Sequence, residues 1–245
     1  MSALEAFAKL EQQLTGNVID LSTAQRAEPI KTVEEIRQEW LKQRYGKFTA
    51  SEFHRLMAYP NKPTELPAGA KTYALEKAIE LLTEFHEEPY INAEMQWGLD
   101  HELEAIAEFS KKIGRIVDKT GQQQAFITLK NDVGCTPDGL IGKTSGIEVK
   151  CPKSTTHFSY LSLKTAEDLK ITKPDYYWQI QGSLWITRRL TWWFVSYDPR
   201  FKSPKHRLKI LCIKRNPDDI DFLKYRLKMA IDYRNTLIKT IGKPQ

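Results

Sequence analysis

The stretch Cys135-Thr-Pro-Asp-Gly-Leu-Ile-Gly-Lys-Thr-Ser-Gly-Ile-Glu-Val-Lys-Cys-Pro152 predicts two short strands joined by a tight turn. Gly142 and Gly146 bracket the residues 143–145, which are Lys, Thr and Ser. Small polar residues beside glycine are typical of a short hairpin loop. The sequence therefore predicts a hairpin whose loop is residues 143–145.

This hairpin would bring charged side chains together on one face. With residues 143–145 as the loop, Asp138 lies opposite Lys150, and the side-chain period of two places Glu148 on the same face. Ile147 and Val149 then point the other way, into a core. Two carboxylates and an ammonium that converge in this way form a cation site with a charged group beside it.

Such a trio suits the hydrolysis of a phosphodiester. Carboxylate oxygens are hard ligands that suit Mg²⁺, and a metal ion held there activates a water and neutralises charge on the phosphate. A lysine alongside orients that water or stabilises the developing negative charge. From these residues alone, a surface hairpin that carries charges on its solvated face is the favoured interpretation.

Several further blocks of sequence share a pattern with this hairpin. Together they resemble the PD-(D/E)XK nuclease core and, within it, the lambda-type phage exonucleases (YqaJ-like viral recombinases). The resemblance runs from about Trp40 to Asp198. Its blocks are Trp40…Arg44-Tyr-Gly…Thr49-Ala-Ser51, Trp97-Gly…Glu102, Thr136-Pro-Asp-Gly, Glu148-Val-Lys150-Cys-Pro152, Tyr176…Gln179-Ile-Gln181…Leu184-Trp185-Ile-Thr187 and Tyr197-Asp-Pro-Arg200.

The composition predicts one α/β domain. A chain of 245 residues is long enough to bury a sizeable core, and its net charge of +6 fits a polyanionic partner without requiring one. The three cysteines are widely spaced and form no zinc pattern, which indicates a reducing compartment. No apolar run is long enough to span a bilayer. We therefore expect a single intracellular domain, 1–245, whose residues 1–30 are loosely structured.

The predicted elements form a mixed central sheet flanked by helices. Residues 115–119 and 124–129 are expected to be strands that lead into the hairpin, and 191–197 and 206–214 two more. Helices are expected over about 92–112, from Pro174, and from Pro217 to near Gly242. Capping boxes at 32–35 and 49–52 predict two further helix starts. The resemblance implies the same arrangement, a restriction-endonuclease-like core.

Glu102 is a carboxylate on the apolar side of the predicted helix 92–112. It falls three residues after Leu99 and four before Ile106, within a stripe that also contains Met95, Leu103 and Phe109. A buried carboxylate is costly unless it is paired or bound to a cation, so a lysine partner at the edge of the stripe is one explanation. The resemblance implies the other, a helix glutamate beside the metal site.

A phosphate site is suggested near the predicted start of the helix at residue 49. Ser51 would lie in its first turn, where free N–H groups favour an anion, and Arg44 offers a planar fork that matches a phosphate. A solvated arginine beside a helix cap is the alternative. The resemblance implies a pocket for a terminal 5′-phosphate made of Arg44, Ser51, Thr136 and Gln179. Tyr176, three residues before Gln179, would reach the nucleotide backbone.

The resemblance implies an activity and its requirements. The expected enzyme is a Mg²⁺-dependent deoxyribonuclease, with Mn²⁺ as a possible substitute and two ions per site. Asp138, Glu148 and the carbonyl of Val149 would hold metal, and Lys150 and Glu102 would complete the catalytic group. It would digest one strand of linear double-stranded DNA from the 5′ end to mononucleotides, leaving a 3′ single strand for recombination by annealing.

The implied setting is a phage or prophage protein in the cytoplasm of a bacterial host. The expected assembly is a homotrimer, the expected partner a phage single-strand annealing protein, and no membrane is involved. Two other functions remain open at this stage: an endonuclease built on the same core, and a DNA-binding module without catalysis.

Overall fold

The computed structural model describes residues 32–83 and 92–241, and the predicted loose segment 1–30 lies outside them. The chain forms two compact units, Met1–Glu39 and Trp40–Gln245. In the first, the predicted capping box of Thr32 is confirmed. The Thr32 hydroxyl accepts a hydrogen bond from the Glu35 N–H at 3.2 Å, and the Glu35 carboxylate accepts from the Thr32 N–H at 2.7 Å. The sheets described below lie in the second unit.

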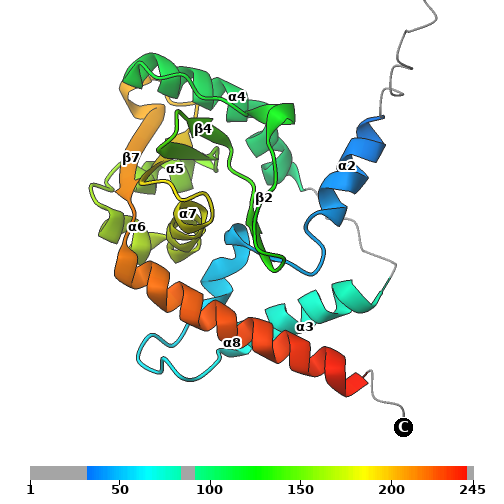
Figure 1. The fold of residues 1–245 in the computed structure, drawn as a ribbon. Helices are drawn as coiled ribbons and strands as arrows, with labels where there is room; N and C mark the ends of the chain where they lie inside the picture. The colour runs from blue at the N-terminus through cyan, green and yellow to red at the C-terminus, as the bar shows by residue number, and fades with distance from the viewer. Residues whose placement is uncertain (1–31, 84–91, 242–245) are drawn as a thin grey trace, which may run out of the picture. The chain divides into compact units, whose positions relative to one another are not determined.

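The described strands form two mixed sheets rather than one (Figure 1). The smaller has the order β1-β3-β2, from β1 (Phe48–Thr49), β3 (Val133–Cys135) and β2 (Ile127–Leu129). The larger has the order β4-β5-β6-β7, from β4 (Gly139–Ile141), β5 (Ser145–Lys150), β6 (Thr191–Tyr197) and β7 (Leu208–Lys214). In the larger sheet β5 and β6 are parallel, whereas β4 and β7 run antiparallel to their neighbours.

Helices make up much of the rest of the described chain. The α-helices are α2 (Val33–Lys42), α3 (Ala68–Leu82), α4 (Ala93–Ile113), α5 (Ser154–Tyr160), α6 (Ala166–Thr172), α7 (Pro174–Ile186) and α8 (Pro217–Ile241). Short 3₁₀ helices are η2 (Ala50–Leu56), η3 (Gly121–Gln123) and η4 (Pro204–His206). The predicted α/β class with a mixed sheet flanked by helices is confirmed. In the described part of the chain, no helix has the length and apolar character needed to cross a membrane.

The hairpin of β4 and β5 forms, but its predicted register is wrong by two residues. Gly139 pairs with Ile147 and Ile141 with Ser145, so the loop is residues 142–144. Gly142 has φ of +52°, a left-handed conformation that glycine adopts without strain. The Ser145 hydroxyl lies 2.6 Å from that of Thr191, which holds Ser145 in the sheet beside β6. Asp138, one residue before Gly139, is therefore level with Glu148 rather than with Lys150.

The larger sheet has a core on each face. On one face, Ile147 and Val149 pack in a cluster with Ala105, Ile106 and Phe109 of α4. On the other, Trp192 and Phe194 of β6 pack with residues of α7 and α8. Gly146 belongs to this second face, because a Cβ there would lie 2.4 Å from the Trp192 ring. Alternation along β5 therefore turns Glu148 and Lys150 away from the α4 cluster and toward α7.

Other predicted elements are confirmed or corrected by the structure. The strand 191–197 and the helices at Pro174 and Pro217 form as predicted. Residues 115–119 form no strand: Asp118 makes only an isolated bridge to Leu140, with backbone hydrogen bonds of 2.7 and 2.8 Å. The second predicted capping box is also wrong, because Thr49 makes no side-chain cap and η2 is a 3₁₀ helix. The cysteines are free thiols, as expected.

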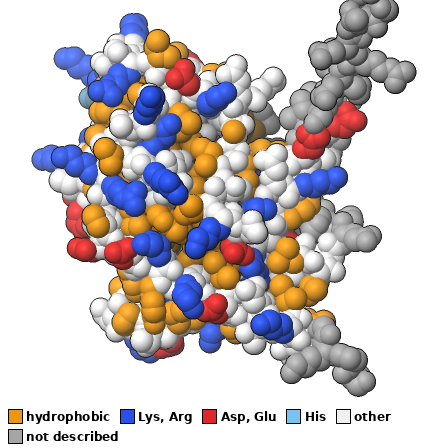
Figure 2. Space-filling view, viewed as in Figure 1, with side chains coloured by type: hydrophobic (Ala, Val, Ile, Leu, Met, Phe, Trp, Pro, Cys, Tyr) orange, Lys and Arg blue, Asp and Glu red, His pale blue; other side chains and the backbone are white. Residues whose placement is uncertain are grey.

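Basic side chains are numerous on the face drawn in Figure 2. On the face drawn in Figure 2, Lys and Arg are spread among apolar and neutral surface, with fewer Asp and Glu between them. Positive charge that is spread over a surface in this way attracts a polyanion without fixing its position. Any specific recognition of such a ligand must come from individual side chains.

The proline-containing loop between η2 and α3 is anchored by one buried arginine. Arg226 of α8 is 0% exposed, and its guanidinium donates to the carbonyls of Tyr59, Lys62 and Glu65. Replacing it leaves these carbonyls without their charged donor. Since hydrogen bonds to charged groups are the stronger ones, we expect Arg226→Met to lower the free energy of unfolding by about 3 kcal/mol.

Urea denaturation of both forms would measure this loss. Lys228→Met is the matched control on the same helix, because the Lys228 side chain is 75% exposed and pairs only with Asp232 four residues on. Exposed pairs of that kind contribute little to stability. Equal stabilities of the two variants would contradict the anchoring role of Arg226.

Candidate active site

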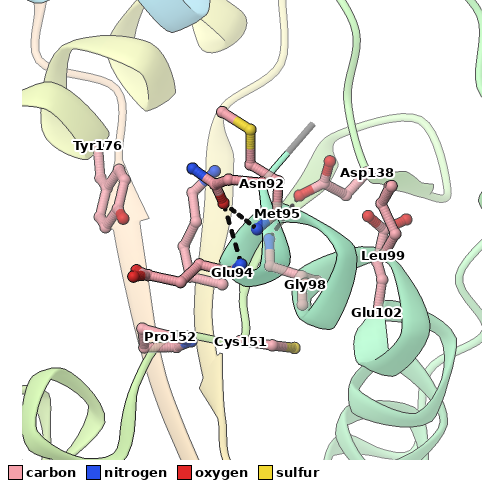
Figure 3. A pocket seen from close by; sticks show the side chains of 12 residues that line it. Asn92, Glu94, Met95, Gly98, Leu99, Glu102, Asp138, Cys151, Pro152 and Tyr176 are labelled. Atoms are coloured by element: carbon pink, nitrogen blue, oxygen red, sulfur yellow. Dashed lines mark hydrogen bonds between the residues drawn. The ribbon is translucent and has the colours of Figure 1, made fainter. Parts of the chain in front are cut away.

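A cleft of about 590 Å³ opens where the N-terminal half of α4 passes the end of the hairpin (Figure 3). Its walls come from the two ends of the hairpin, from α4 and from α7. The lining residues are Asn92, Glu94, Met95, Gly98, Leu99, Glu102, Asp138, Val149, Lys150, Cys151, Pro152 and Tyr176. Three of the four predicted catalytic residues, Asp138, Lys150 and Glu102, thus face one cavity.

Asp138 is fixed by the backbone of β5. Its Oδ2 accepts a hydrogen bond of 2.6 Å from the N–H of Val149, the residue after Glu148. This contact follows from the register, since Asp138 leaves β4 level with Glu148. The bond uses one oxygen of the carboxylate, and the side chain lies at the cleft wall (Figure 3).

Glu148 is the most buried of the predicted catalytic residues, at 1% exposure. Its Oε1 receives the Lys150 ammonium at 2.6 Å and the side-chain amide of Gln179 at 2.7 Å. Its Oε2 is buried with no hydrogen-bond partner among the described residues. A buried carboxylate oxygen without a partner is costly, so this position is one that a cation would stabilise.

Lys150 holds its position through charge and through an aromatic ring. Besides Glu148, its Nζ lies 4.9 Å from the centroid of the Tyr176 ring. Burial opposes the charge of Lys150, but Glu148 and Asp138 outweigh it, so the pKa is raised and the side chain stays an ammonium. Tyr176 itself packs on Phe194, with ring centroids 5.8 Å apart, so the aromatic wall of the cleft rests on β6.

Burial and neighbouring charges raise the pKa of two of these carboxylates, Asp138 and Glu102. Burial, and then the charge of Glu148, raise the pKa of Asp138 well above its usual value, while Lys150 opposes the shift. Burial and Glu148 likewise raise the pKa of Glu102, again against Lys150. Three carboxylates and one ammonium carry a net charge of −2 when all are ionised. A divalent cation would neutralise that charge and restore the ionised forms.

The chemistry of these groups fits a hard divalent cation. Among the described residues, no group of three or more His, Cys, Asp or Glu side chains is already arranged to hold a metal ion. The fit instead rests on the unpartnered Oε2 of Glu148 and on the cleft-facing Asp138 and Val149, whose oxygens are the kind of ligand Mg²⁺ prefers. The three ligands predicted from the sequence therefore lie on adjacent positions of one hairpin.

Of the residues predicted to bind the 5′-phosphate, the structure brings two into contact. The Arg44 Nη1 donates to the Thr136 hydroxyl at 2.9 Å, across 92 residues of sequence. The same guanidinium lies over the rings of Trp40, at 4.3 Å, and Phe126, at 5.2 Å. In the described part of the chain, no carboxylate comes within ion-pair distance of Arg44. Arg44 is therefore a half-buried cation, positioned by a hydroxyl and two rings, that is available to an anion.

Ser51 and Gln179 have other partners in this structure. The Ser51 hydroxyl lies 3.3 Å from that of Thr49, in the first turn of η2, and no contact joins it to Arg44. Gln179 donates to Glu148, which ties α7 to the carboxylates rather than to Arg44. Thr136 contacts Arg44 and lies two residues before Asp138. It therefore connects the predicted phosphate-binding residues with the carboxylates.

Two contacts of the site were missed from the sequence. Gln124 donates to Glu102 Oε1 at 2.7 Å, and the ring of Phe126 supports Arg44. Both residues lie in a stretch predicted as one strand, 124–129, of which only Ile127–Leu129 is a strand. A run of three glutamines carries no periodic signal, so nothing in the sequence singled out the third of them.

The chain is similar in sequence to known proteins. The family model described as the YqaJ-like viral recombinase domain matches residues 39–189. ExoD, an uncharacterized protein of Escherichia coli (strain K12), is 43% identical over 44 residues, which are 18% of this chain. That match spans about half of the relative's own length, 48%.

Solved structures show the same fold. An alkaline exonuclease (LHK-Exo) from Laribacter hongkongensis, also solved in complex with dAMP, has a TM-score of 0.69 and 29% identity, covering 83% of this chain and 95% of that one. A phage related exonuclease from Haemophilus somnus 129PT has a TM-score of 0.64 and 20% identity, covering 80% and 96%. These likenesses confirm the restriction-endonuclease-like α/β core expected from the sequence.

Proposed function

Because this chain belongs to the YqaJ-like viral recombinase family, we propose that it is a Mg²⁺-dependent 5′-to-3′ exodeoxyribonuclease. It degrades one strand of linear double-stranded DNA to mononucleotides and leaves a 3′ single strand. The observation that carries the proposal is the cleft-side group of Asp138, Glu148 and Lys150, in which the ammonium lies 2.6 Å from a nearly fully buried carboxylate. The similar protein from Laribacter hongkongensis is an alkaline exonuclease, which supports the same activity.

In this proposal Asp138, Glu148 and the Val149 carbonyl bind Mg²⁺, or Mn²⁺ in its place, with two ions per site and Glu102 beside them. Bound there, the cation supplies activation of water and neutralisation of charge on the phosphate. The protein groups do the rest: Lys150 donates hydrogen bonds to the negative charge that develops at the scissile phosphate. Tyr176, on the cleft wall against Lys150, positions the nucleotide backbone.

In this proposal the 5′-to-3′ direction of digestion depends on the side chains that bind the 5′ end of the DNA. Arg44 and Thr136 bind the terminal 5′-phosphate in this proposal, with Ser51 and Gln179 completing the pocket. Thr136 is two residues from Asp138 and accepts a hydrogen bond from Arg44. A 5′-phosphate bound to Thr136 would therefore lie one nucleotide along the DNA from the phosphate at the carboxylates. An enzyme that anchors the 5′-terminal phosphate in this way would cut the adjacent bond and release a mononucleotide.

One assay separates this function from its alternatives. Linear and circular duplexes, with 5′-phosphate or 5′-hydroxyl ends, are incubated with the protein in Mg²⁺ or in EDTA. The proposal expects mononucleotides from linear, 5′-phosphorylated DNA only in Mg²⁺. Cutting of the circle would indicate an endonuclease on the same core, and salt-dependent binding without any cleavage would indicate a DNA-binding module.

The pocket itself is tested by Arg44→Ala. Losing a charge-assisted contact to phosphate is expected to reduce the rate preference for 5′-phosphorylated over 5′-hydroxyl ends by about tenfold or more. Lys42→Ala is the matched control, because it removes an exposed positive charge two residues away and reports the non-specific electrostatic loss. A preference that Arg44→Ala leaves intact would place the phosphate pocket elsewhere.

The wider setting is also a proposal. The nuclease domain spans the chain, 1–245, and acts in the cytoplasm of a bacterial host as a phage or prophage protein. Its active form is a homotrimer, since closed cyclic symmetry encloses a strand that a single cleft would release. Its product is passed to a phage single-strand annealing protein. Light scattering on the purified protein measures the stoichiometry directly.

A further inference from the structure

Gln124 makes a direct contact with the carboxylate group of the cleft. Its Nε2 donates to Glu102 Oε1 at 2.7 Å, and 22 residues of sequence separate the two. An amide nitrogen can only donate, so the contact defines which oxygen of Glu102 is occupied. The other oxygen, Oε2, is left for the cleft, which Glu102 lines together with Asp138 (Figure 3).

The segment that carries Gln124 is held on both sides of it. Upstream, the backbone of Asp118 bridges to Leu140 of β4, and the Gln124 N–H closes the η3 turn onto the Gly121 carbonyl at 3.1 Å. Downstream, the Phe126 ring packs against Gly134 of β3, where a Cβ would come within 2.1 Å of it. The amide of Gln124 is thus presented from a segment fixed to both sheets, and not from a free loop.

Glu102 needs such a support because of where it lies. Its neighbours on α4, Leu99 and Leu103, are 58% and 56% exposed, so few side chains pack around this part of the helix. Burial and then the like charge of Glu148 raise the pKa of Glu102, so the ionised Glu102 carboxylate is repelled by Glu148. Gln124 supplies a hydrogen bond that opposes this repulsion and favours the ionised form.

We propose that Gln124 is a positioning residue of the metal site: its amide orients the Glu102 carboxylate so that the free oxygen faces Asp138 and Glu148. This inference rests on the proposed function, since it assumes that the carboxylates bind a divalent cation. Partners that orient metal-binding carboxylates typically change metal affinity by about ten- to a hundredfold. Gln124 would therefore set how tightly the cleft holds its ion.

The test is Mn²⁺ binding to the full-length protein, measured by the loss of the free Mn²⁺ signal in electron paramagnetic resonance. Gln124→Leu keeps the size of the side chain and removes the donor, and its Kd for Mn²⁺ is expected to rise about tenfold or more. Gln123→Ala is the matched control, an exposed glutamine one residue away, and its Kd should equal that of the natural sequence.

A second readout separates positioning from a general structural role. In DNA digestion at increasing Mg²⁺, Gln124→Leu should need more Mg²⁺ for half-maximal rate, while its KM for DNA at saturating Mg²⁺ stays unchanged. Thermal unfolding in EDTA should give the same midpoint for all three proteins. An unchanged Mn²⁺ Kd would overturn the inference. So would a loss of stability in EDTA whose free energy matches the loss of Mn²⁺ binding free energy. Mn²⁺ binding without any DNA cleavage would instead overturn the proposed function and leave the role of Gln124 in place.

Discussion

Replacing Asp138 with asparagine is expected to abolish metal-dependent DNA cleavage while DNA binding survives. Asparagine keeps an oxygen that can accept the 2.6 Å hydrogen bond from the Val149 N–H, so the hairpin retains its register. What is lost is one negative charge from the group of three carboxylates. Since a bound cation supplies several kcal/mol of charge stabilisation, we expect the rate to fall by about a thousandfold or more.

The measurement is single-turnover digestion of a 5′-phosphorylated linear duplex, with binding followed separately in EDTA. Asp118→Asn is the matched control: this exposed aspartate lies on the segment bridged to β4, and its substitution removes the same charge from a position next to that strand. Asp138→Ala should be as inactive as Asp138→Asn, but less stable because the Val149 N–H loses its acceptor. Turnover near the normal rate in Asp138→Asn would remove Asp138 from the metal site.

The faces of the hairpin could be predicted from sequence although its register could not. The predicted loop was one residue too far along, which moved the opposite partner of Asp138 by two positions. A shift of two leaves the side-chain alternation unchanged, so Glu148 and Lys150 still share the face of Asp138. In the observed register Ser145 is a strand residue rather than a loop residue, and its hydroxyl contacts Thr191 on β6, a strand that begins 46 residues later and that no local pattern could bring into the prediction.

The apolar stripe of α4 is predicted to face the core, but three of its five residues do not. Ile106 and Phe109 are buried against the larger sheet, as expected, but Met95, Leu99 and Leu103 are 55–58% exposed. Met95 and Leu99 instead line the cleft. Periodicity reports which residues share a helix face and cannot report how far the neighbouring sheet extends along that face. Glu102, at the point where the sheet ends, was predicted beside the metal site from the family pattern.

The start of η2 shows a local signal overridden by a distant residue. Thr49 and Glu52 have the spacing of a capping box, yet the Thr49 hydroxyl lies 3.3 Å from the phenol of Tyr73 on α3, and the Thr49 N–H donates to the same phenol at 2.8 Å. With its side chain and N–H so engaged, Thr49 caps nothing, and the following turn is 3₁₀. The tertiary partner is 24 residues away, so no local pattern could have predicted it.

Lys150→Ala is expected to lower kcat by about a hundredfold or more, with little effect on the affinity for DNA. The Lys150 ammonium lies 2.6 Å from Glu148 Oε1, and the net effect of the surrounding carboxylates raises its pKa. A group whose pKa is raised keeps its proton through the neutral range, so Lys150 is a donor and a positive charge there, not a base. It can therefore stabilise negative charge that grows during the reaction, an interaction stronger in the transition state than in the bound substrate.

The comparison of kcat with KM decides whether Lys150 acts in this way. Lys153→Ala is the matched control, because Lys153 follows the same strand and its ammonium pairs with Glu94 at 2.5 Å, yet its side chain is 64% exposed. It should change binding slightly and kcat hardly at all, since exposed pairs are weak. Lys150→Ala should lower kcat strongly and change binding hardly at all. Lys150→Arg should recover part of the rate because it restores the charge. A Lys150→Ala variant that raised KM and left kcat unchanged would show that Lys150 binds DNA and takes no part in the chemical step.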